Sequence, residues 1–211
     1  MRTPTLSMLA LALAGCTGST FGYSGFNTHD YFAVDGNRSW KYVQEDGSVE
    51  WRMEVEKVSP AIETDDFTIH TFEYGIYDPA ELLYSIEWST DALNGIMIHG
   101  FAVEGGESVA FSAPLQISEG QMAPGEILEQ SVDGYAFVST FVARETCPNE
   151  WVTDDWECLH FTISDGVDDS SSPPFVGDWW FAADWGASRF NLPSYTSDWV
   201  LSEASWSAED E

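Results

Sequence analysis

The chain has 211 residues, 44% of them hydrophobic and 15% aromatic, so it can fold around a sizeable core and is not intrinsically disordered. Its 36 Asp and Glu residues against 7 Lys and Arg give a formal net charge of -29. A surface of this charge repels phosphate groups, so we exclude nucleic acid as a partner and interpret the charge as a means of solubility.

The chain begins with the elements of an export signal. Arg2 supplies a positive charge, and residues 6–14 form an apolar run of nine residues. A helix that crosses a bilayer needs ~20 apolar residues, whereas a signal peptide needs far fewer. The run leads into Leu13-Ala14-Gly15-Cys16, which resembles the lipobox of bacterial lipoproteins: Leu, a small residue, Gly or Ala, then Cys.

The lipobox resemblance implies a lipid anchor. Residues 1–15 would be removed, and Cys16 would carry diacylglycerol and an N-linked acyl chain such as palmitate. Two or more acyl chains hold a protein stably on a membrane, whereas one holds it marginally. Thr17 stands where an Asp would retain an enterobacterial lipoprotein in the inner membrane, so we expect the outer membrane of the cell envelope. The alternative is an ordinary signal peptide that happens to contain a cysteine.

The segment after Cys16 differs in character from the rest of the chain. Residues 17–30 are rich in Gly, Ser and Thr, and we expect 16–30 to form the lipidated cysteine and a flexible tether to one acidic domain, 31–211. Within that domain, residues 49–56 alternate strictly between apolar and polar side chains. This alternation predicts a half-buried antiparallel strand.

Further strand-like runs follow one another to the end of the chain. They lie around Trp40 and Tyr42 and at 67–77, 82–88, 96–103, 108–113, 135–143, 156–164, 178–185 and 198–206. Asp-Gly or Asn-Gly pairs, which favour tight hairpin turns, occur at 35–36, 46–47, 94–95, 133–134 and 165–166. We therefore predict an all-β fold with little helix: a single antiparallel β-sandwich, or an open or half barrel, of about nine or ten strands.

Short aromatic and glycine motifs recur across the domain. They are YFAVDGNRSWKY at 31–42, WFAADWG at 180–186 and WVLSE at 199–203. In this order they resemble a broad set of bacterial secreted and lipid-anchored domains that has no agreed activity. The resemblance implies a β-rich exported domain and carries no catalytic residues with it.

Cys147 and Cys158 are the two cysteines outside the lipobox. They bracket ten residues between two strand-like runs, and export favours oxidation, so we predict a disulfide across a hairpin. The alternative is a zinc site, which needs about four ligands, and only His160 is near in sequence. We therefore expect no metal site and no cofactor.

Known catalytic motifs are absent from the sequence, which has no His-x-x-x-His pair, no Gly-x-Ser-x-Gly and no phosphate-binding loop. His70 and His99 lie in predicted strands and are interpreted as structural. We expect a lipid-anchored, non-catalytic binding or structural module. One alternative is a carrier of a lipid or other apolar ligand inside a curved sheet. Another is an enzyme acting on polysaccharide, although no carboxylate pair can be selected from the sequence.

Tryptophans and acidic clusters suggest what the module binds. Trp179 and Trp180 are adjacent, so they point to opposite faces of a strand, and Trp185 lies near a predicted loop. Exposed rings stack on sugars or proteins, so these three are candidate binding residues for an envelope protein or glycan; the alternative is an aromatic core. Acidic residues at 63–66, 153–157 and 165–169 suggest weak calcium binding, with solvated loops as the alternative.

Overall fold

The computed structural model describes residues 26–45, 52–77, 80–106, 108–148, 156–167, 171–193 and 197–207. The predicted lipobox with Cys16, the start of the predicted tether and the Asp46-Gly47 pair lie outside these residues. Within the described part of the chain, no helix is long and apolar enough to cross a membrane.

The described residues fold into twelve strands and one short 3-10 helix, as the all-β prediction expects. The elements are η1 (Thr28–Tyr31), β1 (Asn37–Gln44), β2 (Arg52–Glu63), β3 (Thr68–Tyr77), β4 (Ala80–Asp91), β5 (Gly95–Val103), β6 (Ser108–Gln116), β7 (Ile127–Val132), β8 (Tyr135–Thr146), β9 (Glu157–Ser164), β10 (Gly177–Ala182), β11 (Gly186–Asn191) and β12 (Trp199–Ser207).

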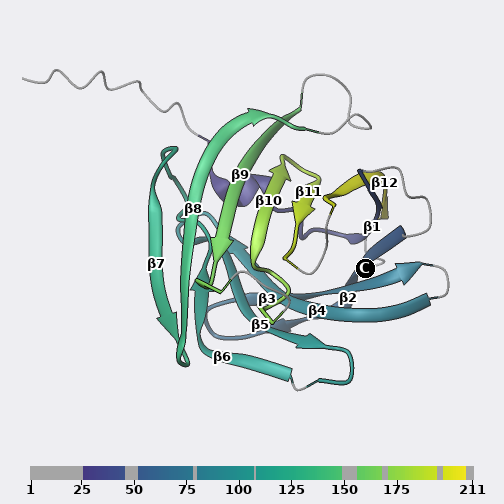
Figure 1. The fold of residues 1–211 in the computed structure, drawn as a ribbon, viewed down its shortest axis with the longest axis horizontal. Coiled ribbons are helices and arrows are strands. Elements are labelled where there is room, and N and C mark those ends of the chain that lie inside the picture. Colours follow the sequence, from purple (N-terminus) through teal and green to yellow (C-terminus); the bar gives the residue numbers. More distant parts are fainter. Residues whose placement is uncertain are drawn as a thin grey trace, which may run out of the picture.

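All twelve strands belong to one antiparallel sheet that coils into a nearly closed barrel (Figure 1). The strand order is β6-β5-β4-β3-β2-β1-β12-β11-β10-β9-β8-β7, so strands that are consecutive in sequence pair with one another, except for the edge strands β6 and β7, and the first strand pairs with the last. The finer expectations of a sandwich or half barrel with nine or ten strands are therefore corrected to one barrel-like sheet with twelve.

The two strands that the sequence pattern missed are β7 and β11. In β11, Ala187 and Phe190 pair with core residues of β10, but a bulge between them leaves the buried Ser188 beside Cys158 on the outer face. The bulge and the small residues break the apolar alternation that the pattern requires. In β7 most side chains are exposed or half-buried, because this strand lies at an edge of the sheet. Neither strand carries the hydrophobic alternation that marks the other ten.

Side chains bridge the seam between the two edge strands, β6 and β7. The Gln130 amide accepts from Gln116 N at 2.9 Å and donates to Gln116 O at 2.5 Å, as a backbone amide of a paired strand would do. The Asp133 carboxylate accepts from the amide and the hydroxyl of Ser112, both at 2.6 Å. Asp133 and Gly134 both have positive φ, as a type I′ hairpin turn requires between β7 and β8.

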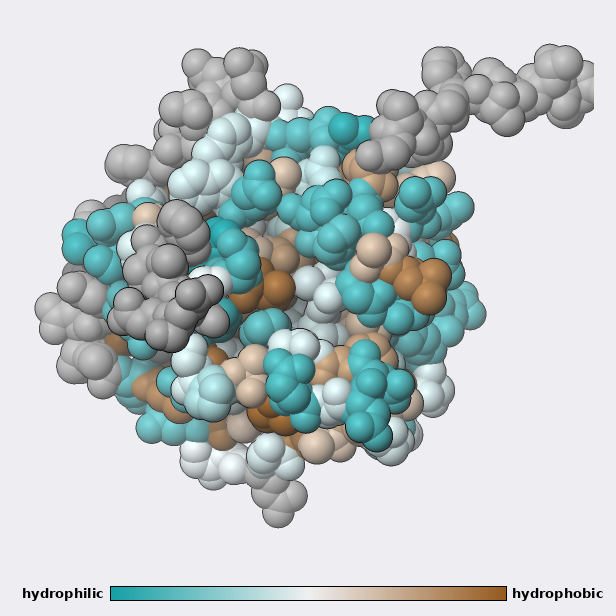
Figure 2. All heavy atoms as spheres, turned by 180° about the vertical axis from the view of Figure 1, so that it is seen from behind, coloured by the Kyte–Doolittle hydropathy of each residue, from teal (hydrophilic) through white to brown (hydrophobic). Residues whose placement is uncertain are grey.

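The inside of the barrel is filled with aromatic rings. Trp88 packs against Trp179 with ring centroids 5.7 Å apart, and both rings are completely buried. Charged side chains are left to the surface, and Figure 2 shows this contrast on one face: hydrophilic side chains cover most of it, and hydrophobic ones are visible in hollows between them. A core of this kind is stabilised by a large buried apolar area rather than by polar networks.

Residues 26–36, here called the strap, cross one end of the barrel. Thr28 donates from its amide to Gly120 O at 3.0 Å, and Asp30 O accepts from Asp184 N at 3.1 Å. The strap thus runs from the β6–β7 connection to the β10–β11 turn. We call this end, which also holds the β2–β3, β4–β5 and β8–β9 connections, the strapped end.

The strap corrects the predicted extent of the tether, which included residues 26–30. Phe26 is buried and packs on Phe141, and Thr28 is completely buried. Further along, Phe32 lies 5.0 Å from Trp88, between ring centroids. Tyr31 donates to Glu157 at 2.5 Å, and burial together with this carboxylate raises the pKa of Tyr31 to about 12, so the hydroxyl keeps its proton.

Candidate functional site

A pocket of about 1070 Å³ opens beside the strap at the strapped end. We call it the mouth pocket. It is lined by residues 34–37 of the strap and β1, by residues of β2 between 57 and 63, and by Thr68, His70 and Thr90. Its volume is of the order expected for a small-molecule site, roughly 300–1,000 Å³.

Polar side chains of the mouth pocket stand on the inward face of the sheet. His70 is the cross-strand partner of Trp88 and Thr90 is the partner of Ile96, and both partners are completely buried. Lys57 is the partner of Phe72, which is also in the core. Paired residues lie on the same face of a sheet, so the aromatic interior gives way to polar groups at this end.

The charged groups around the mouth pocket have partners within the chain. Lys57 Nζ donates to Val34 O at 2.8 Å, which ties β2 to the strap. The Asp35 carboxylate accepts from Arg38 at 2.6 Å, and the Glu63 carboxylate accepts from the Thr68 hydroxyl at 2.8 Å. The lining thus carries one positive charge and two negative charges, and Arg38 neutralises the charge of Asp35.

The Thr90 hydroxyl in the pocket lining has its hydrogen-bonding capacity unused. The Thr90 hydroxyl oxygen is buried and makes no hydrogen bond within the described residues. Such a group costs about 1–3 kcal/mol when nothing solvates it, and buried orphan hydroxyls are uncommon in folded proteins. A bound molecule or a water would therefore be stabilised by a hydrogen bond to the Thr90 hydroxyl.

Deeper in the barrel, the space is much smaller. A cavity of about 20 Å³ lies among Phe32, Trp40, Phe72, Tyr74 and Trp179. This volume is enough for about one water molecule. Burial raises the pKa of Tyr74, so its hydroxyl remains neutral in the core.

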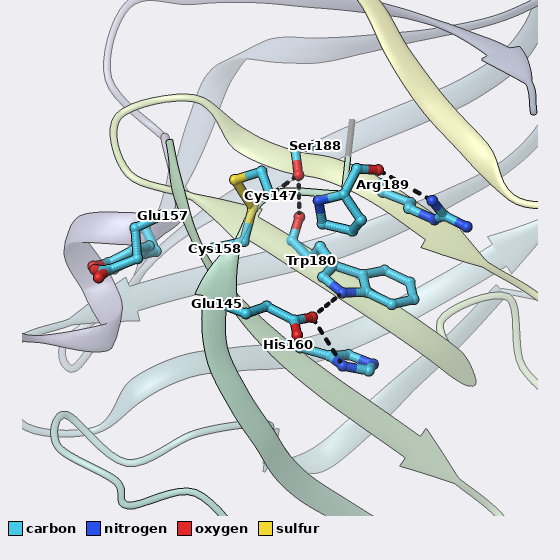
Figure 3. The surroundings of a disulfide bond; sticks show 10 residues. Glu145, Cys147, Glu157, Cys158, His160, Trp180, Ser188 and Arg189 are labelled. Atoms are coloured by element: carbon cyan, nitrogen blue, oxygen red, sulfur yellow. Dashed lines mark hydrogen bonds and ion pairs between the residues drawn. A yellow bond between two sulfur atoms is a disulfide. The ribbon is translucent and has the colours of Figure 1, made fainter. Parts of the chain in front are cut away.

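A second group of polar side chains lies on the outer face of β8 to β11, beside the disulfide (Figure 3). We call His160, Trp180, Arg189, Glu145 and Asp178 the outer cluster. The His160 ring stacks on Trp180 with centroids 4.1 Å apart, and the Arg189 guanidinium carbon lies 5.3 Å from the Trp180 ring centre. Imidazole, indole and guanidinium thus follow one another across three neighbouring strands.

Carboxylates hold the outer cluster in place. Glu145 accepts from Trp180 Nε1 at 2.8 Å and lies 3.5 Å from His160 Nδ1. Asp178 lies 3.2 Å from His160 Nε2, and the hydrogen bond with His160 lowers the pKa of Asp178. Arg189 also pairs with Asp198 and, at 2.7 Å, with Glu45.

The structure joins Cys147 and Cys158 in a disulfide, the pairing that the sequence predicted, with 4.9 Å between the Cα atoms. It links the end of β8 to the start of β9. Both cysteines belong to a small apolar group on the outside of the sheet, to which Ala182, Trp156 and Trp180 contribute. The disulfide therefore lies directly beneath the outer cluster.

Comparison with protein-family models, with curated proteins and with solved structures finds no match to this chain.

The three candidate tryptophans differ in their burial and in their neighbours. Trp179 is completely buried, so it is not an exposed binding residue; its place on β10 faces the core. Trp180 is half-buried within the outer cluster. Trp185 is 37% exposed and stacks on Trp156 with centroids 4.5 Å apart, beside the strapped end.

The histidines and acidic clusters contribute no ligand set in the described residues. His70 and His99 are not brought together: His70 faces the mouth pocket, whereas His99 accepts or donates a hydrogen bond with Ser89 at 2.7 Å. No group of three or more His, Cys, Asp or Glu in that part of the chain could hold a metal ion. Of the acidic clusters only 63–66 is described throughout, and calcium binding stays a prediction.

The mouth pocket is not among the sites predicted from the sequence. A signal for Lys57 was nevertheless present. The inward alternation of Met53 and Val55 continues to position 57, which places one of the two lysines of the chain on a buried face. No comparable signal joins Lys57 to His70 and Thr90, because strand pairing alone brings them together.

Proposed function

We propose that this chain is a lipid-anchored, non-catalytic binding protein of the cell envelope. The Leu13-Ala14-Gly15-Cys16 motif supports the anchor and the envelope location. The mouth pocket supports the binding role, and it is the single observation that carries it: a pocket with converging polar side chains at the end of an otherwise filled barrel.

The mouth pocket favours binding over catalysis. Its two carboxylates are already occupied within the fold, Asp35 by Arg38 and Glu63 by Thr68. Hydrolysis of a glycosidic bond needs a protonated acid and a second carboxylate placed on either side of the bond. Binding needs only donors and acceptors fixed on rigid strands, and the pocket supplies these.

The filled interior favours a polar ligand at the mouth over an apolar ligand inside the barrel. The central cavity of about 20 Å³ is far too small for an acyl chain. The interior that a lipid carrier would leave open is occupied by rings such as Trp88, Trp179 and Phe181.

The strap connects the proposed anchor to the pocket. Phe26 is the first described residue and follows Cys16 by ten positions. Ten residues can span at most about 35 Å even when fully extended. The strapped end, and the mouth pocket with it, would therefore be held close to the membrane surface.

Metabolic labelling with radioactive palmitate tests the proposed anchor. The wild-type chain should incorporate label and sediment with the membrane fraction, whereas Cys16→Ser should take up no label and keep its signal peptide. Ser19→Ala, outside the four-residue motif, is the matched control and should label normally. Equal labelling of wild type and Cys16→Ser would refute the anchor.

A further inference from the structure

We infer that the mouth pocket binds a small, neutral, hydroxyl-rich molecule, with a monosaccharide or disaccharide unit as the chemical class. The inference rests on the proposed binding function and narrows its ligand. It is carried by the size of the pocket, the kind of groups that line it, their charge balance and the orphan hydroxyl of Thr90.

The groups in the mouth pocket match alternating donors and acceptors. Thr90 contributes a hydroxyl that can both donate and accept, whereas the Ser59 and Thr68 hydroxyls already donate to Asn37 and Glu63 and can still accept. Asn37 adds a side-chain amide and His70 an imidazole. Sugar hydroxyls also donate and accept at once, so this lining can pair with several of them without burying an unmatched charge.

The charge balance argues against charged ligands. An anion would meet Glu63 and Asp35 at the pocket and a chain with a formal net charge of -29 around it. A cation would meet Lys57, whose ammonium group lies in the lining and donates to Val34 O. Nearly balanced local charges and a polar lining leave a neutral polar ligand as the class that fits best.

The Thr90 hydroxyl provides a point of attachment. It stands on the inward face of β4 next to the buried Ile96, and its oxygen has no hydrogen bond within the described residues. A ligand hydroxyl that enters the pocket would satisfy it. Its removal should therefore weaken binding while leaving the fold intact, because no hydrogen bond within the described residues is lost with it.

Isothermal titration calorimetry on the purified full chain tests the inference. The chain is kept in a zwitterionic detergent without a sugar head group, so that the detergent does not compete. The neutral probes are glucose, galactose, N-acetylglucosamine, maltose and cellobiose; the charged comparators are glucuronate and glucosamine. At least one neutral probe should bind, with a dissociation constant on the order of 1 mM, more tightly than either comparator.

Two variants locate the binding. Thr90→Val should weaken the affinity for the neutral sugar about fivefold, the effect of one hydrogen bond. Thr71→Val, on the opposite face of β3, is the matched control and should leave the affinity unchanged. Equal weakening by both variants would place the sugar elsewhere and overturn the inference.

The failure of this inference can be told apart from failure of the proposed function. If a charged comparator binds best and Thr90→Val weakens it, the sugar class is wrong but the mouth pocket remains a binding site. If no probe binds, the sugar inference is overturned. Palmitate labelling decides the proposed anchor independently of both results.

Discussion

The mouth pocket and the outer cluster use similar residue types on opposite faces of one sheet. Each has a cation, a histidine and carboxylates: Lys57 and His70 in the pocket, Arg189 and His160 in the cluster. In the outer cluster, His160 lies against Glu145 and Asp178 and stacks on Trp180. In the mouth pocket, the hydroxyl of Thr90 has no hydrogen bond within the described residues.

This difference separates two uses of polar side chains. Groups that satisfy one another stabilise the fold, and their loss leaves a partner with an unmet charge or hydrogen bond. Groups that the fold leaves unsatisfied add little to stability and are available to a ligand. We therefore expect substitutions around the outer cluster to lower stability, and substitutions in the mouth pocket to change binding instead.

The largest effect on stability is expected at the disulfide beneath the outer cluster. Replacing both Cys147 and Cys158 by serine should lower the free energy of unfolding by about 3 kcal/mol, because the unfolded chain regains the entropy of a short closed loop. Urea denaturation measures the change. The wild-type chain in excess dithiothreitol should show the same loss, and an unchanged urea midpoint would contradict the stabilising role.

The next largest effect is expected at Arg189. Arg189→Met should lower the free energy of unfolding by about 2 kcal/mol, since the mostly buried Asp198 loses its cation. Lys41→Met is the matched control: it removes a cation that pairs with the exposed Glu203 at 3.3 Å and should cost less than about 0.5 kcal/mol. Equal costs in urea denaturation would show that the outer cluster is no better paired than the open surface.

The outer cluster should also carry a pH dependence. The His160 hydrogen bond lowers the pKa of Asp178 below its ordinary value of about 3.9, so the ionised carboxylate stabilises the fold above that pH. The contribution is lost as the pH falls through the lower folded pKa. Wild type should therefore lose up to about 0.5 kcal/mol more stability than Asp178→Asn between pH 5 and pH 2, after allowance for solvent screening. Parallel stability curves for the two proteins would exclude this contribution.

The smallest effect is expected in the mouth pocket. Thr90→Val should raise the free energy of unfolding by about 0.5 kcal/mol, because a methyl group of the same shape replaces an unsatisfied buried hydroxyl. Thermal unfolding, followed by tryptophan fluorescence, measures the shift. A loss of about 1 kcal/mol or more would mean that the fold itself depends on this hydroxyl, and the contrast between the two regions would disappear.

Much of the sheet could be predicted from the sequence, because most strands have one face in the core. Met53 and Val55 are buried and the neighbouring Glu56 is exposed, so alternation reveals β2 directly. The pattern fails in β11, where a bulge between Ala187 and Phe190 leaves Ser188 beside the disulfide instead of in the core. It also fails for β7, although the Asp133-Gly134 pair marks the turn that follows this strand.

The candidate site was harder to predict from the sequence than the strands were. The mouth pocket depends on the pairing of β2, β3 and β4 and on a strap that arrives from the N-terminal side. None of these contacts leaves a periodic signal. The first five residues of the strap lie in the segment that was predicted to be a tether, and their burial and that of Phe32 depend on partners that lie far along the chain. Local patterns therefore reveal which side chains face inward but not which ones meet.

The pairing of β1 with β12 has a consequence for how the protein is made. Asn37 pairs with Ser207 at the other end of the sequence, so the barrel cannot close until the last strand has been synthesised. Until then, the edge of β1 is open to pairing with other chains, and contacts of such long sequence separation form slowly. A chain truncated before β12 would keep β1 and β11 as two additional free edges. The nine-residue strand β12 is thus the closing step of assembly, and its loss should promote aggregation.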